Sequence, residues 1–153
     1  MERTLLIIKP DGVERRLVGG VIRRMEAKGL KLVALQMMTL SEERAGDLYS
    51  VHKGKPFFEK LIRFITRGPI VGVVLEGPEC ISVVRNLMGA ANYLEALPGT
   101  IRGDFSTNIT ENIVHGSDSR DNAEQEISVI FPDLNYTLPE CQEEANSSTV
   151  SFS

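Results

Sequence analysis

Two short apolar runs, at residues 4–8 and 70–75, constrain the fold of this chain more than any other feature. The first reads TLLII and is followed at once by the turn Lys9-Pro10-Asp11-Gly12. The second reads IVGVVL and is rich in β-branched residues. Short, nearly continuous apolar runs of this kind are typical of strands that are buried inside a sheet. We therefore expect a sheet at the centre of the fold.

Helical patterns separate these two strands. Val18, Ile22 and Met25 recur at spacings of four and three residues and predict a helix that ends near Gly29. Residues 30–38 then have the character of a strand, and Ser41 is a candidate N-cap for the next helix. A further helical stripe runs up to the stop at residues 68–69, and it consists of Phe58, Leu61, Ile62 and Ile65.

The second half of the chain repeats the pattern of helix and strand. Pro78 opens a predicted helix that Gly89 closes. Residues 90–111 are expected to be irregular, and a short apolar run then leads into His115. The last predicted helix begins near Asp121, where Asp121 and Glu124 have the spacing of a capping box.

The resulting order is β-α-β, two extra helices, then β-α-β. It favours an α+β fold of the ferredoxin-like, split βαβ type, with a four-stranded antiparallel sheet, helices on one face and an inserted helical hairpin. A doubly wound parallel sheet is the alternative, but it calls for a glycine-rich turn after the first strand, which residues 10–12 do not provide. We expect one domain over residues 1–133 and a polar, flexible tail over residues 134–153.

Composition excludes several function classes. The net charge is −4, with an excess of four basic residues in residues 1–60 (12 against 8) and of eight acidic residues in residues 61–153 (5 against 13). This balance gives little support to nucleic acid as the main partner, and phosphate binding is expected in a local pocket. The two cysteines match neither a zinc pattern nor a disulfide framework, and no apolar run is long enough for a signal sequence or a membrane span. We expect a cytoplasmic protein.

The segment NIVHGSDS at residues 112–119 carries the strongest indication of chemistry. His115 ends an apolar run and is followed by small, hydroxyl-bearing residues, so one ring nitrogen can meet a ligand while the other is held from behind. Imidazole is largely neutral, and therefore nucleophilic, near pH 7. Ser117 offers a hydrogen-bond donor, Asp118 can hold a water of a magnesium shell, and Glu126 can orient the ring. The alternative for His115 is a purely structural histidine, and the alternative for Glu126 is an exposed charge on a helix.

Other side chains beside glycine or proline suit a phosphate ligand. Arg85 and Arg102 can grip phosphate oxygens in two-point fashion, although surface ion pairs are the commoner fate of arginine. Lys9 lies at the carboxyl end of the first predicted strand, where ligands tend to bind. Phe57 is off the helical stripe, so it is either an exposed ring on which a base stacks or part of the core.

Together these segments resemble the nucleoside diphosphate kinase family over essentially residues 1–131. The matching stretches read IKPDGV at 8–13, KPFF at 55–58, GP at 68–69, PGTIRGDF at 98–105 and NIVHGSDS at 112–119. The resemblance implies a subunit that assembles into hexamers or tetramers. It also implies ping-pong transfer of a γ-phosphate from a nucleoside triphosphate to a histidine and then to a nucleoside diphosphate, with Mg²⁺.

The resemblance also implies a role for each matching residue. His115 is the nucleophile, Glu126 and Ser117 support it, and Tyr49 lies beside it. The nucleotide would be held by phosphate contacts from Arg85 and Arg102, by sugar contacts from Lys9 and Asn112, by stacking on Phe57, and by Ile109 over the other face of the base.

One loop departs from the family pattern. The family has Gly-x-Thr-x-Pro where this chain has Gly89-Ala90-Ala91-Asn92-Tyr93. The lost threonine hydroxyl is worth about 0.5–1.5 kcal/mol if it bonds a phosphate, or roughly 2- to 13-fold in rate or affinity. We expect weakened function and not its abolition, while the lost proline bears on assembly.

Two other functions compete with the kinase. A nucleotide-binding regulatory protein with reduced activity agrees with Ala91 and Tyr93, but it predicts losses at the histidine or the arginines, which are all present. A histidine phosphocarrier that serves another protein would need neither the ring of Phe57 nor contacts to a sugar.

Overall fold

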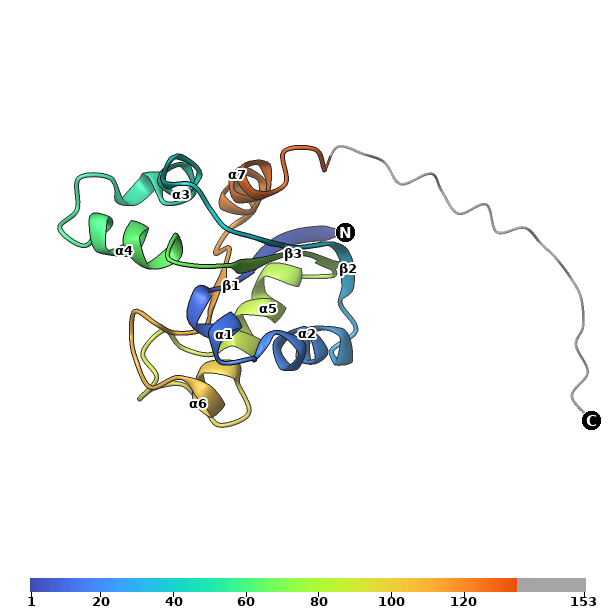
Figure 1. Cartoon of the computed structure of the whole chain (residues 1–153). Coiled ribbons are helices and arrows are strands. Elements are labelled where there is room, and N and C mark those ends of the chain that lie inside the picture. Colours follow the sequence, from blue (N-terminus) through green and yellow to red (C-terminus); the bar gives the residue numbers. More distant parts are fainter. Residues whose placement is uncertain (135–153) are drawn as a thin grey trace, which may run out of the picture.

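A four-stranded antiparallel sheet lies at the centre of the computed structural model, which describes residues 1–134 (Figure 1). The strand order is β2-β3-β1-β4, and every neighbouring pair is antiparallel. The strands are β1 (Glu2–Ile8), β2 (Lys31–Met38), β3 (Ile70–Gly77) and β4 (Val114–Gly116). The four-stranded antiparallel α+β fold predicted from the element order is confirmed. Residues 135–153, almost all of the expected tail, lie outside the described residues.

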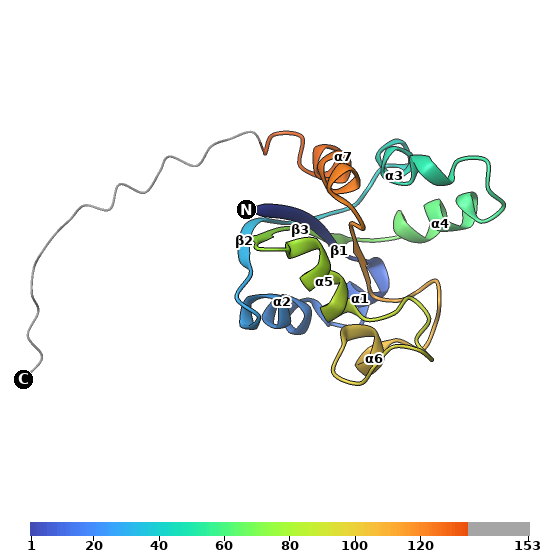
Figure 2. The ribbon, with the colours of Figure 1, turned by 180° about the vertical axis from the view of Figure 1, so that it is seen from behind.

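Helices cover both faces of this sheet, so the expectation of helices on one face was wrong. Figure 1 shows α1 (Pro10–Glu14), α2 (Val18–Ala27), α5 (Cys80–Met88) and α6 (Ile101–Phe105) on one side. The other side carries α3 (Glu42–Leu48), the 3-10 turn η1 (Ser50–His52), α4 (Phe58–Ile65) and α7 (Arg120–Ile130). Figure 2 shows the same two layers from behind.

The central strands explain the two layers. Leu6 and Ile8 of β1 belong to a core cluster with α2 and α5, whereas Leu5 and Ile7 belong to a second cluster with α3, α4 and α7. All four side chains are fully buried. Because successive side chains of a strand point to opposite faces, a strand that is apolar at every position needs cover on both sides.

Two local features of the second half differ from the sequence-based expectation. Residues 101–105, expected to be irregular, form α6, whose N-cap Thr100 accepts a hydrogen bond from the backbone N–H of Gly103. The predicted capping box of Asp121 and Glu124 is also wrong. The helix α7 begins at Arg120, and its cap is Ser119, which accepts from the Asn122 N–H at 3.2 Å.

The first half agrees more closely with expectation. Ser41 caps α3 by accepting a hydrogen bond from the Arg44 N–H at 3.2 Å, as predicted. In α2, Met25 is buried as the helical stripe predicts, but the second fully buried position is Val21, whereas Val18 and Ile22 are only partly buried. Among residues 1–134, no helix has both the length and the apolar character that crossing a membrane requires.

Candidate active site

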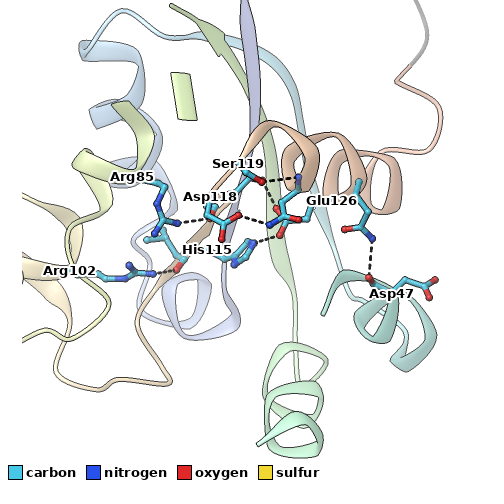
Figure 3. Close-up of polar contacts among 12 residues, drawn as sticks. Asp47, Arg85, Arg102, His115, Asp118, Ser119 and Glu126 are labelled. Atoms are coloured by element: carbon cyan, nitrogen blue, oxygen red, sulfur yellow. Dashed lines mark hydrogen bonds and ion pairs between the residues drawn. The ribbon is translucent and has the colours of Figure 1, made fainter. Parts of the chain in front are cut away.

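His115 lies on the short edge strand β4, opposite Ile7 of the buried strand β1. Its Nε2 is 3.0 Å from Oε1 of Glu126, a residue of α7 (Figure 3). The second carboxylate oxygen of Glu126 accepts a hydrogen bond from the Ser117 hydroxyl. Because a carboxylate can only accept, Nε2 carries the ring proton in this contact, and Nδ1 keeps its lone pair. The imidazole is therefore oriented with Nδ1 as the ring nitrogen that has a free lone pair.

Tyr49 directly follows α3, and its ring packs beside His115. Its ring meets the His115 ring edge-on, with 5.8 Å between centroids and an interplanar angle of 81°. Burial and the nearby charge of Glu126 raise the pKa of Tyr49, so the phenol stays protonated. Its buried hydroxyl has no hydrogen-bond partner within residues 1–134, which leaves a donor beside the histidine.

Two arginines lie on the side of His115 away from Glu126 (Figure 3). Arg85, from α5, donates to the Gly116 carbonyl at 3.2 Å. Arg102, in α6, is buried and donates to the carbonyls of Gly89, Asn112 and Val114 at 3.0, 3.3 and 2.7 Å. Burial and the charge of Arg85 lower the pKa of Arg102 to about 10, so both guanidinium groups are charged at neutral pH. Within residues 1–134 the hydrogen bonds of these two guanidinium groups go to backbone carbonyls, and two neighbouring cations of this kind favour an anion between them.

A cavity of about 420 Å³ adjoins these arginines and includes Ala91 in its lining. The departure from the family pattern therefore lies at the wall of the cationic site. The Asn92 side chain is held at its Oδ1, which accepts a hydrogen bond from the Leu94 N–H at 3.1 Å. The consequence expected for Ala91 and Tyr93 stays a prediction.

Lys9 and Asn112 form a second polar pair next to the arginines. The Lys9 ammonium donates to Oδ1 of Asn112 at 2.7 Å, and both side chains are buried. Burial, and then repulsion by Arg102, lower the pKa of Lys9 to about 8, while the charge of Asp11 acts in the opposite direction. A lysine with this pKa is partly deprotonated in the range where enzymes work.

Phe57 and Ile109 face a cleft of about 230 Å³ that Lys9 and Leu61 also line. Phe57 is 48% exposed, which agrees with the exposed ring and not with core packing, and Ile109 is 61% exposed. An exposed aromatic ring opposite an exposed aliphatic side chain can enclose a flat apolar ligand, and a nucleobase has that shape. Leu61 has the helical spacing of a core residue, so its place in this cleft could not be predicted from the sequence.

Asp118 is the one predicted metal-binding residue. Its side chain accepts a hydrogen bond from Nδ2 of Asn122 at 2.5 Å, and this bond, with the charge of Arg85, lowers the pKa of the carboxyl against the effect of burial. No three His, Cys, Asp or Glu side chains in residues 1–134 are grouped closely enough to hold a metal by themselves. A single carboxylate beside Arg85 is compatible with the expected role of Asp118, which is to hold a water of a phosphate-bound Mg²⁺ ion, and this role stays a prediction.

The structure also reveals a contact that the sequence did not indicate. Oδ2 of the buried Asp11 accepts a hydrogen bond from the N–H of Ile113 at 3.0 Å, immediately before β4. These residues are 102 positions apart in the chain. The Pro-Asp-Gly sequence indicated only a turn, and no local pattern could have located its distant partner.

Comparison with known proteins agrees with this geometry. The sequence profile of the family described as nucleoside diphosphate kinase matches residues 2–136. A nucleoside diphosphate kinase of Staphylothermus marinus is 56% identical over 132 residues, which cover 86% of this chain and 94% of the relative. That of Thermobifida fusca is 54% identical, with 88% and 99% covered.

The chain belongs to the nucleoside diphosphate kinase family.

Solved structures of this family have the same fold. A halophilic nucleoside diphosphate kinase of Halobacterium salinarum in complex with CDP superimposes with a TM-score of 0.83 at 46% identity, with 86% of this chain and 88% of that chain covered. The enzyme of Encephalitozoon cuniculi gives a TM-score of 0.87 at 37% identity, with 94% and 98% covered. The chain is a phosphotransferase that acts between nucleotides, and transfer through a histidine is characteristic of its family.

The low pKa of Lys9 predicts that the catalytic efficiency of this kinase falls on the alkaline side of its pH profile. Below about pH 8 the free enzyme carries an ammonium in the cleft, and above it the group is neutral and loses its attraction for a nucleotide. We expect kcat/KM, which reports the free enzyme, to fall as pH rises through about 8, by roughly tenfold per unit well above that value. In Lys9→Gln the profile should be low and lack this inflection. An unchanged inflection near pH 8 in Lys9→Gln would assign the fall to another group.

Proposed function

We propose that this chain transfers the γ-phosphate of a nucleoside triphosphate to a nucleoside diphosphate through a phosphohistidine on His115. The observation that carries the proposal is the placement of the ring. Glu126 holds Nε2 at 3.0 Å, and the cationic groups of Arg85 and Arg102 lie on the opposite side (Figure 3). The nucleophilic nitrogen is thus next to the positive charge that would hold a phosphoryl group.

The reaction has two balanced halves. In the first, the Nδ1 lone pair of His115 attacks the γ-phosphorus, an N–P bond forms, and the bond to the β–γ bridging oxygen breaks with its electron pair leaving on the nucleoside diphosphate. The imidazole gains positive charge, which the carboxylate of Glu126 stabilises without taking the proton. In the second half, an oxygen of another diphosphate attacks the same phosphorus and the N–P bond breaks. Ser117 keeps Glu126 in place throughout.

The remaining predicted residues account for the nucleotide. Phe57 and Ile109 enclose the base by apolar contact, which tolerates different bases. The Lys9 ammonium and the Asn112 amide supply polar contacts for the sugar. When Mg²⁺ is bound to the phosphates it neutralises part of their charge, and Asp118 would hold one of its waters.

The two competing functions fit the geometry less well. A phosphocarrier that passes its phosphoryl group to another protein needs a histidine but not a cleft between Phe57 and Ile109. A regulatory protein with reduced activity needs no nucleophile, yet His115, Glu126 and both arginines are arranged for phosphoryl transfer.

We further propose that the protein is a homo-oligomer, a hexamer or tetramer as in the resembling family, and that it is cytoplasmic. The edge strand β2 supports assembly, because within residues 1–134 it pairs only with β3 and it carries two exposed apolar side chains, Leu35 (52%) and Met37 (57%). An exposed apolar edge strand is a site of association. Cell fractionation tests the location.

Sedimentation tests the assembly. The chain has a mass of 16.9 kDa, and we expect a sedimenting species several times heavier. Introducing a charge on the exposed strand, as in Met37→Lys, should shift the distribution towards smaller species, since the charge would have to be buried without a partner. The matched control is Lys31→Arg, an exposed position on the same strand. A wild-type protein that sediments as a monomer would refute the proposal.

Labelling with γ-³²P ATP tests the nucleophile. We expect wild-type enzyme to acquire a label that acid removes and base does not, and to lose it to GDP in a chase. His115→Ala should acquire no such label and should lose ATP-to-GDP exchange by at least about a thousandfold, because no other residue in the site is a plausible acceptor. The control is His52→Ala, which removes the only other histidine. Exchange by His115→Ala at more than a trace would contradict the assignment.

A further inference from the structure

Asp11 is a buried carboxylate that the proposed reaction does not use. It lies in the first turn of α1, directly after the end of β1, and only 5% of the residue is exposed. Its Oδ2 accepts the hydrogen bond from the Ile113 N–H at 3.0 Å, and its Oδ1 is buried without a partner within residues 1–134. Burial raises the pKa of Asp11, so the surroundings do not favour its charge. A polar group kept at such a position needs an explanation.

The partner of Asp11 has an unusual backbone. Ile113 has φ +77°, in the left-handed region that L residues avoid, and it is β-branched, which makes this conformation a genuine outlier. Such a residue persists only when its surroundings hold it there. Both backbone groups of Ile113 are held by the junction of β1 and α1: Asp11 accepts from its N–H, and the Lys9 N–H donates to its carbonyl at 2.8 Å.

Contact at this junction is close. A Cβ atom added to Gly12 would lie 2.8 Å from Cγ2 of Ile8 and 3.1 Å from the Ile113 carbonyl oxygen. The start of α1 and the backbone of Ile113 therefore meet without space for a side chain, and a displacement of one is transmitted to the other.

Three polar residues of the site, Lys9, Arg102 and His115, are attached next to Ile113. The preceding residue, Asn112, accepts from Lys9 through its side chain and from Arg102 through its carbonyl. The following residue, Val114, accepts from Arg102 through its carbonyl at 2.7 Å, and His115 comes next. A change in the backbone conformation of Ile113 would therefore move His115 relative to Lys9 and Arg102.

We infer that Asp11 is a positioning residue, whose carboxylate holds Ile113 in its left-handed conformation and thereby sets the geometry between His115, Arg102 and Lys9. The inference rests on the proposed phosphotransfer through His115. The competing role for Asp11 is purely electrostatic, since its charge also acts on the Lys9 ammonium.

Two substitutions separate these roles. Asp11→Asn removes the charge but keeps an oxygen that can accept from Ile113. Asp11→Glu keeps the charge but adds a methylene, so the acceptor cannot stay 3.0 Å from the same N–H. Each variant is assayed as the full chain for kcat and KM with ATP and GDP. Rates are normalised to the number of subunits that γ-³²P ATP can label, which removes any contribution from misfolded protein. Asp133→Asn, at an exposed carboxylate, is the matched control.

We expect Asp11→Glu to lower kcat by roughly 10- to 100-fold, the range for a misplaced catalytic group, with a smaller change in KM. Asp11→Asn should keep kcat within about threefold of wild type. The inference is overturned if Asp11→Glu has wild-type kcat, or if Asp11→Asn loses as much as Asp11→Glu. If neither substituted protein folds, amide exchange in wild type decides: the Ile113 N–H must then exchange among the slowest in the protein, and fast exchange overturns the inference. If the proposed phosphotransfer itself is wrong, the result is different: wild-type enzyme then carries no label on His115.

Discussion

The guanidinium of Arg102 connects α6 to two other segments of backbone on which the site is built, the end of α5 and residues 112–114. Its donors reach the carbonyl of Gly89 at the end of α5, that of Asn112 before β4, and that of Val114 within β4. A planar guanidinium has five donors spread over a rigid fork and can satisfy several separated carbonyls at once, whereas a lysine ammonium has three donors on a single atom. Since the charge is neutralised by no carboxylate among these contacts, the same interaction that orders the segments leaves the site positive.

That positive character explains the behaviour of the neighbouring groups. Arg102 lowers the pKa of Lys9, and Arg85 contributes to the low pKa of Arg102, so three cations gather at a place where burial disfavours the charge of two of them, Lys9 and Arg102. Folding therefore stores an unfavourable arrangement that a polyanionic ligand relieves. The phosphates of a nucleotide carry the complementary negative charge, which links the fold to the phosphotransfer proposed for His115.

Much of this architecture follows from local patterns in the sequence. The runs in β1 and β3 and the cap at Ser41 depend on neighbours in the chain, and each was predicted. The same holds for the isolated features around His115, where glycine and hydroxyl-bearing residues indicate an open position. The resemblance to a known family then supplied residues, such as Tyr49 and Ile109, whose placement no local pattern indicates.

What could not be predicted depends on tertiary contacts. The helix α6 is only five residues long, which is too short to show a helical stripe of apolar residues in the sequence. Arg102 is buried there because its guanidinium bonds carbonyls of other segments. The cap of α7 is Ser119, although Asp121 and Glu124 have the better-known spacing, because β4 ends at Gly116 and the chain enters the helix soon afterwards. The bond from Ile113 to Asp11 joins residues that only the assembled sheet brings together.

The central claim is that Glu126 fixes the histidine so that Nδ1 receives the phosphoryl group. The most direct measurement is NMR of enzyme labelled with ¹⁵N in its histidines and phosphorylated by ATP, in which coupling to ³¹P identifies the bonded nitrogen. The geometry of Nε2 and Oε1, 3.0 Å apart, predicts that the phosphorus is coupled directly to Nδ1 of His115. A phosphoryl group on Nε2, or on any other residue, would contradict the account.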